Sequence, residues 1–552
     1  MNRFFTFLLL LLTIVSCKKS STVITPTNPT LPSTYFFTDL KVNGAFSGFT
    51  YNGLNQEPEI KISFSAPINA ASIKDNINLS DSFGNTATFS STFENNDNTL
   101  VIKPTALQAL TKYILTVNTG LLSKLGNKLQ SAVTVNLTTS ANDVDKFARI
   151  SDNDLLTLIQ KQTFKYFWDF AHPNSGMARE RNTSGDIVTT GGTGFGIMSI
   201  VTAVNRNFIT RIEGKARIQK ILSFLKSADR FHGVFPHWIN GNTGKVQAFS
   251  AKDNGADLVE TAFLMEGLLV ARQYFNSNDA DEVNLRADVN LLFNAVEWDW
   301  FRKNGEDRLY WHWSSNFNWE MNLPVRGWNE ALMVYVLAAS STTHTIPKSV
   351  YDAGWAANGG MKNGNTYYGV QLPLGPPNGG PLFFEHYSFM ALNPNSLTDA
   401  YANYEVQAKA HTKINYNYCV ADPLKFGYSK DCWGLTASDI NGGYTASSPN
   451  NDKGYIAPTA AVASLPFAPE ESMQAIRFFY YKLGDKLLGE YGFKDAFSLH
   501  DPWFAQSYLA IDQGPQIVMI ENYRTGLIWD LFMSCPEVKS GLIKLGFQSP
   551  KI

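Results

Sequence analysis

The stretch FSAKDNGADLVETAFLMEGLLVARQYF, residues 249–275, predicts a polar loop that leads directly into a helix. Apolar residues recur at helical spacing through its second part, after the glycine of DNGAD. Asp257 and Glu260 lie three residues apart, so both carboxylates fall on one face of the helix, one turn apart. Asp253 lies just before them. This stretch therefore places three acids at the head of an apolar helix.

Two interpretations of these acids are open. Like charges this close repel each other, and burial would raise the pKa of one carboxyl, which is the condition that a general acid needs at neutral pH. Alternatively, the acids stabilise the helix dipole from the first turn, where carboxylates are favoured in any helix.

Similar helical patterns recur through the rest of the chain and predict an all-α domain over 148–548. They lie at 155–168, 216–228, 257–275, 283–297, 328–340, 398–412, 470–489 and 515–533. Long stretches rich in Gly, Pro and Asn separate them, notably 172–193, 232–256, 354–397 and 437–459. Many helices without βαβ alternation predict an all-α toroid, and the usual enzyme form is an (α/α)6 barrel whose loops form a cleft.

Residues 35–140 have a different period. Polar and apolar residues alternate over 59–64, 112–118 and 134–138, and turn residues separate these runs. Several short strands at this spacing predict a β-sandwich. The order of strands and turns resembles bacterial Ig-like domains. Nothing in this segment carries chemistry, so we expect a spacer or a packing partner.

The N-terminus is predicted to be a targeting segment that is not part of the folded protein. An apolar run over residues 4–15 is too short to span a bilayer and suits a signal peptide. It ends in Ser16-Cys17, which resembles the bacterial lipobox, so we expect a signal peptide at 1–16, lipidation of Cys17 and a tether at 17–34. The lipid would be the only membrane attachment and would place the protein in the bacterial cell envelope, periplasmic or on the outer surface. The alternative is an ordinary signal peptide with a chance Cys.

Composition excludes several classes of function. Lys and Arg number 46 against 48 Asp and Glu, so no basic surplus favours a nucleic-acid partner. No GxSxG, P-loop, Rossmann or HExxH motif occurs, and the cysteines show no zinc spacing, so we expect no cofactor and no metal.

Cys419 and Cys432 either form a disulfide or stay buried thiols, as Cys535 would. The oligomeric state is undetermined. Hydrolysis by carboxylates alone remains.

Aromatic residues indicate a carbohydrate partner. All twelve Trp lie at or after Trp168, and six lie within 298–328. Flat aromatic faces suit the apolar faces of sugar rings, although tryptophans also fill the core of a large helical domain. Glu330 follows Trp328 and heads an apolar run, as a site residue or a first-turn charge. The alternation at 308–314 predicts a short hairpin.

Seven blocks of the chain, in order over about residues 160–535, carry a family resemblance. They are GMARERN, GGTGFGIMSIV, DRFHGVFPHWINGNTGKV, the stretch 249–275, VRGWNEALMVYVLAASS, PLFFEHYSFMALNPN, and YGFKDAFSL with AIDQGPQIVMIENYRTGLIW. They resemble the glucoamylase-like family, most of all its bacterial β-1,2-glucanases of glycoside hydrolase family 144. The resemblance implies an (α/α)6 barrel and inverting hydrolysis of β-1,2-glucan to sophorose or short sophorooligosaccharides. Its candidate catalytic acids fall on Asp257, Glu260 and Glu330.

Roles within the site are hypotheses at this point. We expect Glu330 to lie across the cleft and protonate the leaving oxygen, while Asp257 or Glu260 holds the water. Substrate-binding residues are expected at His237, Trp238, Asp253, Trp328, His386, Tyr387 and Trp433. Endo action and exo release of sophorose are both open. The competing functions are hydrolysis or transglycosylation of another β-glucan, and glycan binding by a surface lipoprotein without catalysis.

Overall fold

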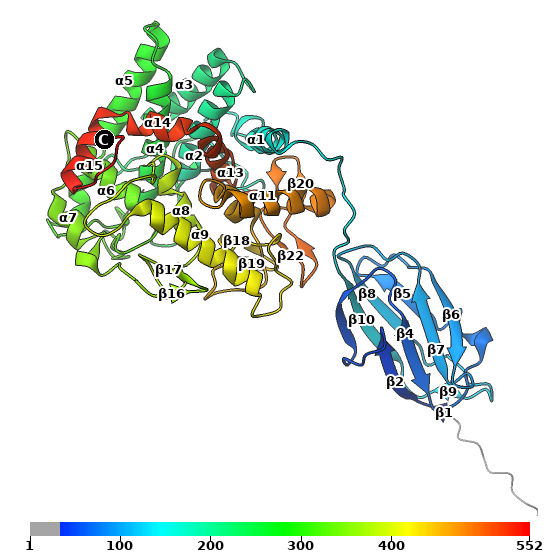
Figure 1. Ribbon diagram of the computed structural model, residues 1–552. Helices are drawn as coiled ribbons and strands as arrows, with labels where there is room; N and C mark the ends of the chain where they lie inside the picture. Colours follow the sequence, from blue (N-terminus) through cyan, green and yellow to red (C-terminus); the bar gives the residue numbers. More distant parts are fainter. Residues whose placement is uncertain (1–33) are drawn as a thin grey trace, which may run out of the picture. The chain divides into compact units, whose positions relative to one another are not determined.

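A computed structural model describes residues 34–552, which form two compact units (Figure 1). The predicted signal peptide, the lipidation of Cys17 and nearly all of the tether lie outside the described residues.

The first unit is built from two four-stranded sheets (Figure 1). One sheet has the order β2 (Phe37–Val42), β4 (Ile60–Phe64), β7 (Thr99–Pro104), β6 (Phe89–Glu94). The other has the order β3 (Thr50–Leu54), β10 (Val133–Thr139), β8 (Lys112–Val117), β5 (Ile77–Asp81), and β1 (Thr34–Tyr35) pairs with β9 (Lys128–Leu129). Alternate residues are buried along β4 and β8, as in sheets that pack face to face.

The second unit is helical (Figure 1). Its helices are α1 (Asp152–Trp168), α2 (Thr190–Asn205), α3 (Arg211–Ser227), α4 (Leu258–Tyr274), α5 (Ala280–Asn294), α6 (Leu332–Ser340), α7 (Lys348–Ala353), α8 (Phe383–His386), α9 (Tyr404–Ala421), α10 (Pro458–Ala463), α11 (Pro469–Arg477), α12 (Gly484–Leu487), α13 (Ala510–Thr525), α14 (Leu527–Met533) and α15 (Pro536–Leu545). Nearly every residue of α2, α4, α6 and α10 is buried, whereas α3 and α5 bury one face each. Helices that are apolar all round belong inside a large domain.

Helix α2 was not predicted, because its first turns read Thr-Gly-Gly-Thr-Gly-Phe-Gly, and glycine disfavours helices. The glycines allow close packing against α4. A Cβ at Gly194 would lie 2.0 Å from the carbonyl oxygen of Phe263, and one at Gly267 would lie 2.2 Å from the carbonyl oxygen of Gly194. The expected loop at 172–193 therefore ends in a buried helix, which tertiary packing stabilises against its local preference.

The segment predicted as a hairpin, 308–314, folds back antiparallel on the residues that follow it, through bridges of Tyr310 with Pro324 and of Ser314 with Asn318. Strand β15 (His312–Trp313) pairs with β14 (Ala256–Asp257), the strand that leads into α4, and His312 faces Asp257 in that ladder. Other short strands lie in the loops: β11 (Ile187–Thr189), β12 (Trp238–Asn240), β13 (Val246–Gln247), β16 (Thr366–Tyr367), β17 (Val370–Gln371), β18 (Ala437–Ile440), β19 (Gly443–Ala446), β20 (Leu488–Gly489), β21 (Gly492–Phe493), β22 (Phe497–Ser498) and β23 (Trp503–Phe504).

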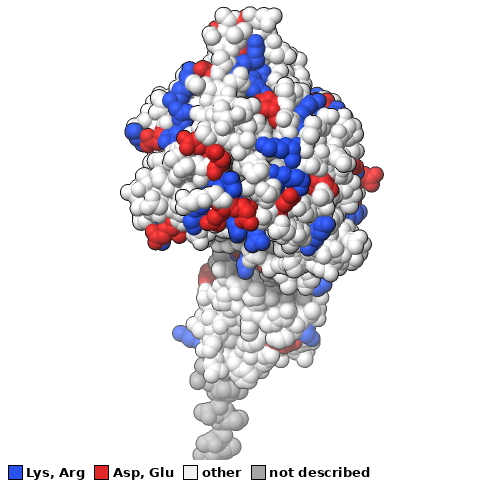
Figure 2. Space-filling model, turned by 90° about the vertical axis from the view of Figure 1, so that its left-hand side faces the viewer, with Lys and Arg blue, Asp and Glu red and all other residues white. Residues whose placement is uncertain are grey.

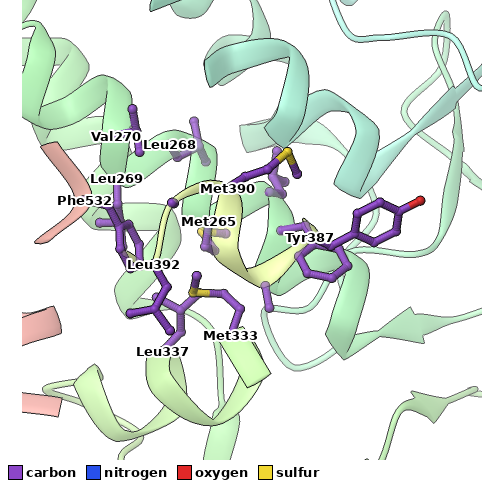
Figure 3. Close-up of a cluster of buried hydrophobic side chains, with 14 of the residues drawn as sticks. Met265, Leu268, Leu269, Val270, Met333, Leu337, Tyr387, Met390, Leu392 and Phe532 are labelled. Carbon is purple, nitrogen blue, oxygen red and sulfur yellow. The ribbon is translucent and has the colours of Figure 1, made fainter. Parts of the chain in front are cut away.

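The core of the helical unit lies around α4. Met265 and Leu269 of α4 pack with Met333 and Leu337 of α6 and with Phe532 of α14 (Figure 3). The ring of Tyr387 lies at the edge of this cluster (Figure 3). This packing fixes the position of α4, and with it the acids at the start of that helix.

Surface charge is mixed on the face of the helical unit that Figure 2 shows, where acidic and basic side chains alternate without a continuous basic area. Among the described residues, no helix is long and apolar enough to span a membrane. Cys419, Cys432 and Cys535 are buried free thiols, so the alternative of a Cys419–Cys432 disulfide is not adopted.

Candidate active site

Asp257 lies at the junction of β14 and α4. Its Oδ1 atom caps the helix, because it accepts the backbone N–H groups of Val259 at 3.0 Å and Glu260 at 2.9 Å. The side chain is fully buried. One oxygen of this carboxylate is therefore used to start the helix, and only Oδ2 is left for the site.

Two histidines converge on that oxygen. Asp257 Oδ2 lies 3.1 Å from His237 Nδ1 and 3.3 Å from His312 Nε2. Asp253 Oδ2 lies 3.2 Å from the same His312 nitrogen and 3.9 Å from His237 Nδ1. Both aspartates are buried. The four side chains form one cluster of two carboxylates and two imidazoles, which we call the His-Asp cluster.

Charges in the His-Asp cluster stabilise one another. Burial alone lowers the pKa of a histidine, but the charge of Glu260 and the hydrogen bond to Asp257 raise the pKa of His237 to about 9. Burial opposes charge on His312 too, yet Asp253 and Asp257 raise its pKa to about 10. Burial likewise raises the pKa of Asp257, and the bonds from both histidines outweigh it and hold that pKa below its usual range. The cluster therefore contains two imidazolium ions at neutral pH.

Glu260 lies one turn into α4 and faces His237. Its Oε2 accepts the backbone N–H of Gly191, at the start of α2, at 2.7 Å, and its Oε1 lies 3.8 Å from His237 Nε2. Burial raises the pKa of Glu260 above its usual value, and the charge of Asp257 adds to the rise, while His237 opposes it. A small part of the side chain remains accessible, so this carboxyl is able to meet a ligand.

Glu330 lies two residues before α6, at the end of a different loop. Ser388 holds its backbone, because the Ser388 hydroxyl donates to the Glu330 carbonyl and accepts the Met333 N–H at 2.9 Å. Burial raises the pKa of the Glu330 carboxyl to about 7, and repulsion from Glu260 and Asp257 contributes. The three acids predicted from the sequence are thus brought into one electrostatic neighbourhood, and Glu330 carries a proton for much of the neutral range.

A metal ion would find donor atoms here. His237, Asp253 and Asp257 each offer one ligand atom, and these atoms lie within 4.8 Å of one another. The same atoms already form the ion pairs of the His-Asp cluster, so both carboxylates are neutralised by imidazolium. We therefore describe the cluster as a set of ion pairs and assign it no metal.

Aromatic rings line one side of the site. Phe249 stacks on His237 with 4.2 Å between ring centroids and meets Trp238 edge-on at 4.8 Å. Phe249 is 49% exposed, and Trp238 is half-buried. The sequence patterns did not identify Phe249 as a site residue, because a single Phe in a loop gives no signal of its own. Phe249 is nevertheless the first residue of the stretch 249–275.

Several predicted sugar contacts are buried in this structure. Trp433 is completely buried and donates its indole N–H to the carbonyl of Glu471, and His386 is buried and hydrogen-bonded to Ser464. Trp328 is 6% exposed and packs among Trp355, Phe389 and Tyr404. These side chains fill the core, so they present no face to a ligand.

Tyr387 is different, although it is only 8% exposed. Burial raises the pKa of its hydroxyl well above the usual value, and the charges of Asp512, Tyr444, Glu330 and Glu260 add to the rise. The hydroxyl is therefore under the electrostatic influence of both the predicted acids and a second acidic group.

The second group was not foreseen. Asp495 and Asp512 are buried, and burial and repulsion from neighbouring aspartates raise both pKa values, that of Asp495 to about 7. The backbone N–H of Asp439 donates to Asp495 at 2.6 Å, and the Asp439 carboxylate pairs with Arg181 at 3.2 Å. Arg181, Asp439, Tyr444 and Trp503 border a cleft of about 570 Å³. Asp439 lies in β18, Asp495 in a loop and Asp512 in the first turn of α13, so no local sequence signal joins these acids.

Comparisons with known proteins follow the two units. A bacterial Ig-like domain model matches residues 40–139, a Glycoamylase model matches 322–536, and a model of unknown function, DUF3131, matches 159–259. The chain is 46% identical over 420 residues to the exo β-1,2-glucooligosaccharide sophorohydrolase (non-reducing end) of Parabacteroides distasonis. That match covers 72% of this chain and 58% of the relative, so this chain spans less than two thirds of that protein's length.

The chain is also similar to solved structures. The endo-β-1,2-glucanase from Chitinophaga pinensis, in complex with sophorotriose and glucose, is 49% identical with a TM-score of 0.72, and the match covers 73% of this chain and 100% of that one. The β-1,2-glucanase from Parabacteroides distasonis is 38% identical with a TM-score of 0.71, and the match covers 93% of this chain and 73% of that one.

Proposed function

Because the chain belongs to the glucoamylase-like family that contains bacterial β-1,2-glucanases, we propose that it hydrolyses β-1,2-glucan to sophorose or short sophorooligosaccharides. One observation carries the proposal. Glu330, with its pKa raised to about 7, lies in the electrostatic field of Glu260, so one site holds a protonated carboxyl and a second carboxyl. Glycoside cleavage needs such a pair and no cofactor.

The helical unit is proposed to be an (α/α)6 barrel. Support comes from the buried helices α2, α4, α6 and α10, which suit an inner ring, and from α3 and α5, which bury one face as outer helices do. The acids at the start of α4 and before α6 would then lie at the same end of that ring.

The mechanism follows from the protonation states. Glu330 is the proton donor to the leaving oxygen, since burial keeps its carboxyl protonated near neutral pH. Glu260 is the base that orients and deprotonates water on the opposite side of the bond. Asp257 is removed from that role, because Val259, Glu260, His237 and His312 occupy its oxygens. Attack by water on the face opposite the leaving group inverts the anomeric carbon.

Substrate would lie along the aromatic side formed by Trp238 and Phe249, with its hydroxyls toward the acids. The named relatives include both an exo-acting sophorohydrolase and an endo-β-1,2-glucanase. Both modes are therefore compatible with the proposed chemistry, and the sizes of the products over time distinguish them.

The test is release of reducing sugar from linear β-1,2-glucan by the purified chain, with Glu330→Gln as the matched variant. We expect release by the wild type and a loss of about 10²–10⁴-fold in the variant, the usual contribution of a general acid. Binding of glucan without release by the wild type would overturn the proposal in favour of a glycan-binding protein. Release by Glu330→Gln at the wild-type rate would remove Glu330 from the mechanism.

The proposed place of action is the bacterial envelope, with a lipid on Cys17. Ser16-Cys17 after an apolar run supports it. Metabolic labelling with palmitate, compared between the wild type and Cys17→Ala, is the test; equal labelling of both would contradict it.

A further inference from the structure

His312 makes its polar contacts with active-site acids. The β14–β15 ladder places it opposite Asp257, and its Nε2 atom lies 3.2 Å from Asp253 Oδ2 and 3.3 Å from Asp257 Oδ2. The side chain is buried, and its Nδ1 atom has no hydrogen-bond partner among the described residues. A histidine that merely tied loops together would bond backbone groups, whereas this one bonds two carboxylates.

We propose that His312 is a positioning residue of the active site, which bridges Asp253 and Asp257 and thereby fixes the His237 ring that faces Glu260. The inference rests on the proposed function, because Glu260 is the base in the proposed hydrolysis. His312 itself touches no reacting group in this arrangement. It acts through Asp257 and His237, whose contact with Glu260 was described above.

Charge balance explains why a second histidine is needed. The groups that face His312 are Asp253 from the loop before β14, Asp257 from β14, and through them His237 and Glu260. Without His312, one imidazolium would have to neutralise two buried carboxylates, and an unpaired buried charge is costly. His237 would then be drawn between Asp253, now 3.9 Å away, and Asp257. The geometry at Glu260 would loosen.

The experiment compares His312→Gln and His312→Leu with the wild type. Gln keeps a donor but not the charge, and Leu removes both. We expect kcat to fall by about 10–100-fold in His312→Leu and less in His312→Gln, the range known for groups that orient functional side chains. KM should stay within about twofold, since no sugar contact is removed.

The pH profile separates positioning from packing. Removing a cation disfavours the ionised form of nearby carboxylates. In His312→Gln the acidic limb of kcat/KM should therefore move to higher pH. His232→Gln is the matched control: His232 stacks on Trp300 and contacts Trp313, the neighbour of His312, but its ion pair is with Glu297 outside the site. Its profile should match the wild type.

A second measurement needs no substrate. In protein labelled with ¹⁵N-histidine, the His237 titration should move to higher pH in His312→Gln, because a neighbouring positive charge is gone. This readout stands even if the chain does not cleave β-1,2-glucan, so failure of the proposed function and failure of this inference are distinguishable. His312→Gln protein that folds and shows an unchanged His237 titration overturns the inference, as does an unchanged kcat with an unchanged acidic limb.

Discussion

The Oε2 atom of Glu260 accepts the backbone N–H of Gly191 at 2.7 Å, and a Cβ at Gly191 would lie 2.6 Å from that same oxygen. The start of α2 therefore supplies a donor to the proposed base and leaves no room for a side chain. A glycine-rich helix start, which the sequence patterns did not predict as helix, is thus part of the proposed active site.

Gly191→Ala should displace the Glu260 carboxylate while leaving the helix intact, because alanine is the better helix former. We expect kcat to fall by about tenfold or more, equal to about 1.4 kcal/mol of transition-state stabilisation. The measurement is the rate of reducing-sugar release together with circular dichroism. A folded variant with the wild-type kcat would show that the Gly191 contact has no catalytic role.

Activity should decline as pH rises through about 7. The proposed proton donor is Glu330, whose pKa burial raises to about 7, and only its protonated form would protonate the leaving oxygen. The basic limb of kcat/KM against pH should therefore lie near this value, and it should be absent from the residual activity of Glu330→Gln. A wild-type rate that stays constant to about pH 9, two units above that pKa, would contradict the assignment.

Trp238→Ala and Trp433→Phe should distinguish a tryptophan that contacts substrate from a tryptophan that fills the core. Trp238 lies beside Phe249 at the site, so its loss should raise KM by about tenfold, which corresponds to about 1.4 kcal/mol. Trp433 is buried, so its replacement should lower the melting temperature and leave KM unchanged. Initial rates over a range of glucan concentrations give KM, and thermal melts give the melting temperature of each variant. A raised KM in Trp433→Phe would restore it as a sugar contact.

Gly194→Ala should destabilise the helical unit. Its Cβ would lie 2.0 Å from the carbonyl oxygen of Phe263, and forcing atoms into a packed core costs about 1–3 kcal/mol. Gly196→Ala is the control, since the nearest obstacle to its Cβ is the Phe167 ring, a side chain that is freer to shift than backbone. Denaturant unfolding should show a larger loss for Gly194→Ala; equal stability of that variant and the wild type would mean that the two helices move apart freely.

Much of the fold follows from local patterns. Helix α4 runs over Leu258–Tyr274 where the pattern predicted 257–275, and the strands of the first unit begin and end close to the predicted limits of 35 and 140. Periodicity works for the strands, for α3 and for α5, because each of these elements buries one face. It failed for α2, whose burial on all sides and close contact with α4 require glycine where a helix alone would disfavour it.

The candidate acids were likewise accessible from the sequence, whereas their roles were not. Asp257, Glu260 and Glu330 lie at the start of apolar segments, and this pattern is visible in a single sequence. That Asp257 has no free oxygen depends on His237 and on His312, and His312 reaches it from a distant part of the chain through the β14–β15 pairing.

By itself, then, the sequence determined the division into a β unit and a helical unit, the candidate acids and the aromatic richness of the helical unit. Only the tertiary structure decided which tryptophans fill the core, which carboxyl is held ionised and which keeps its proton. The reason is that pKa and exposure are set by neighbours distant in the chain, through burial and charge, whereas periodicity and composition are properties of the chain alone.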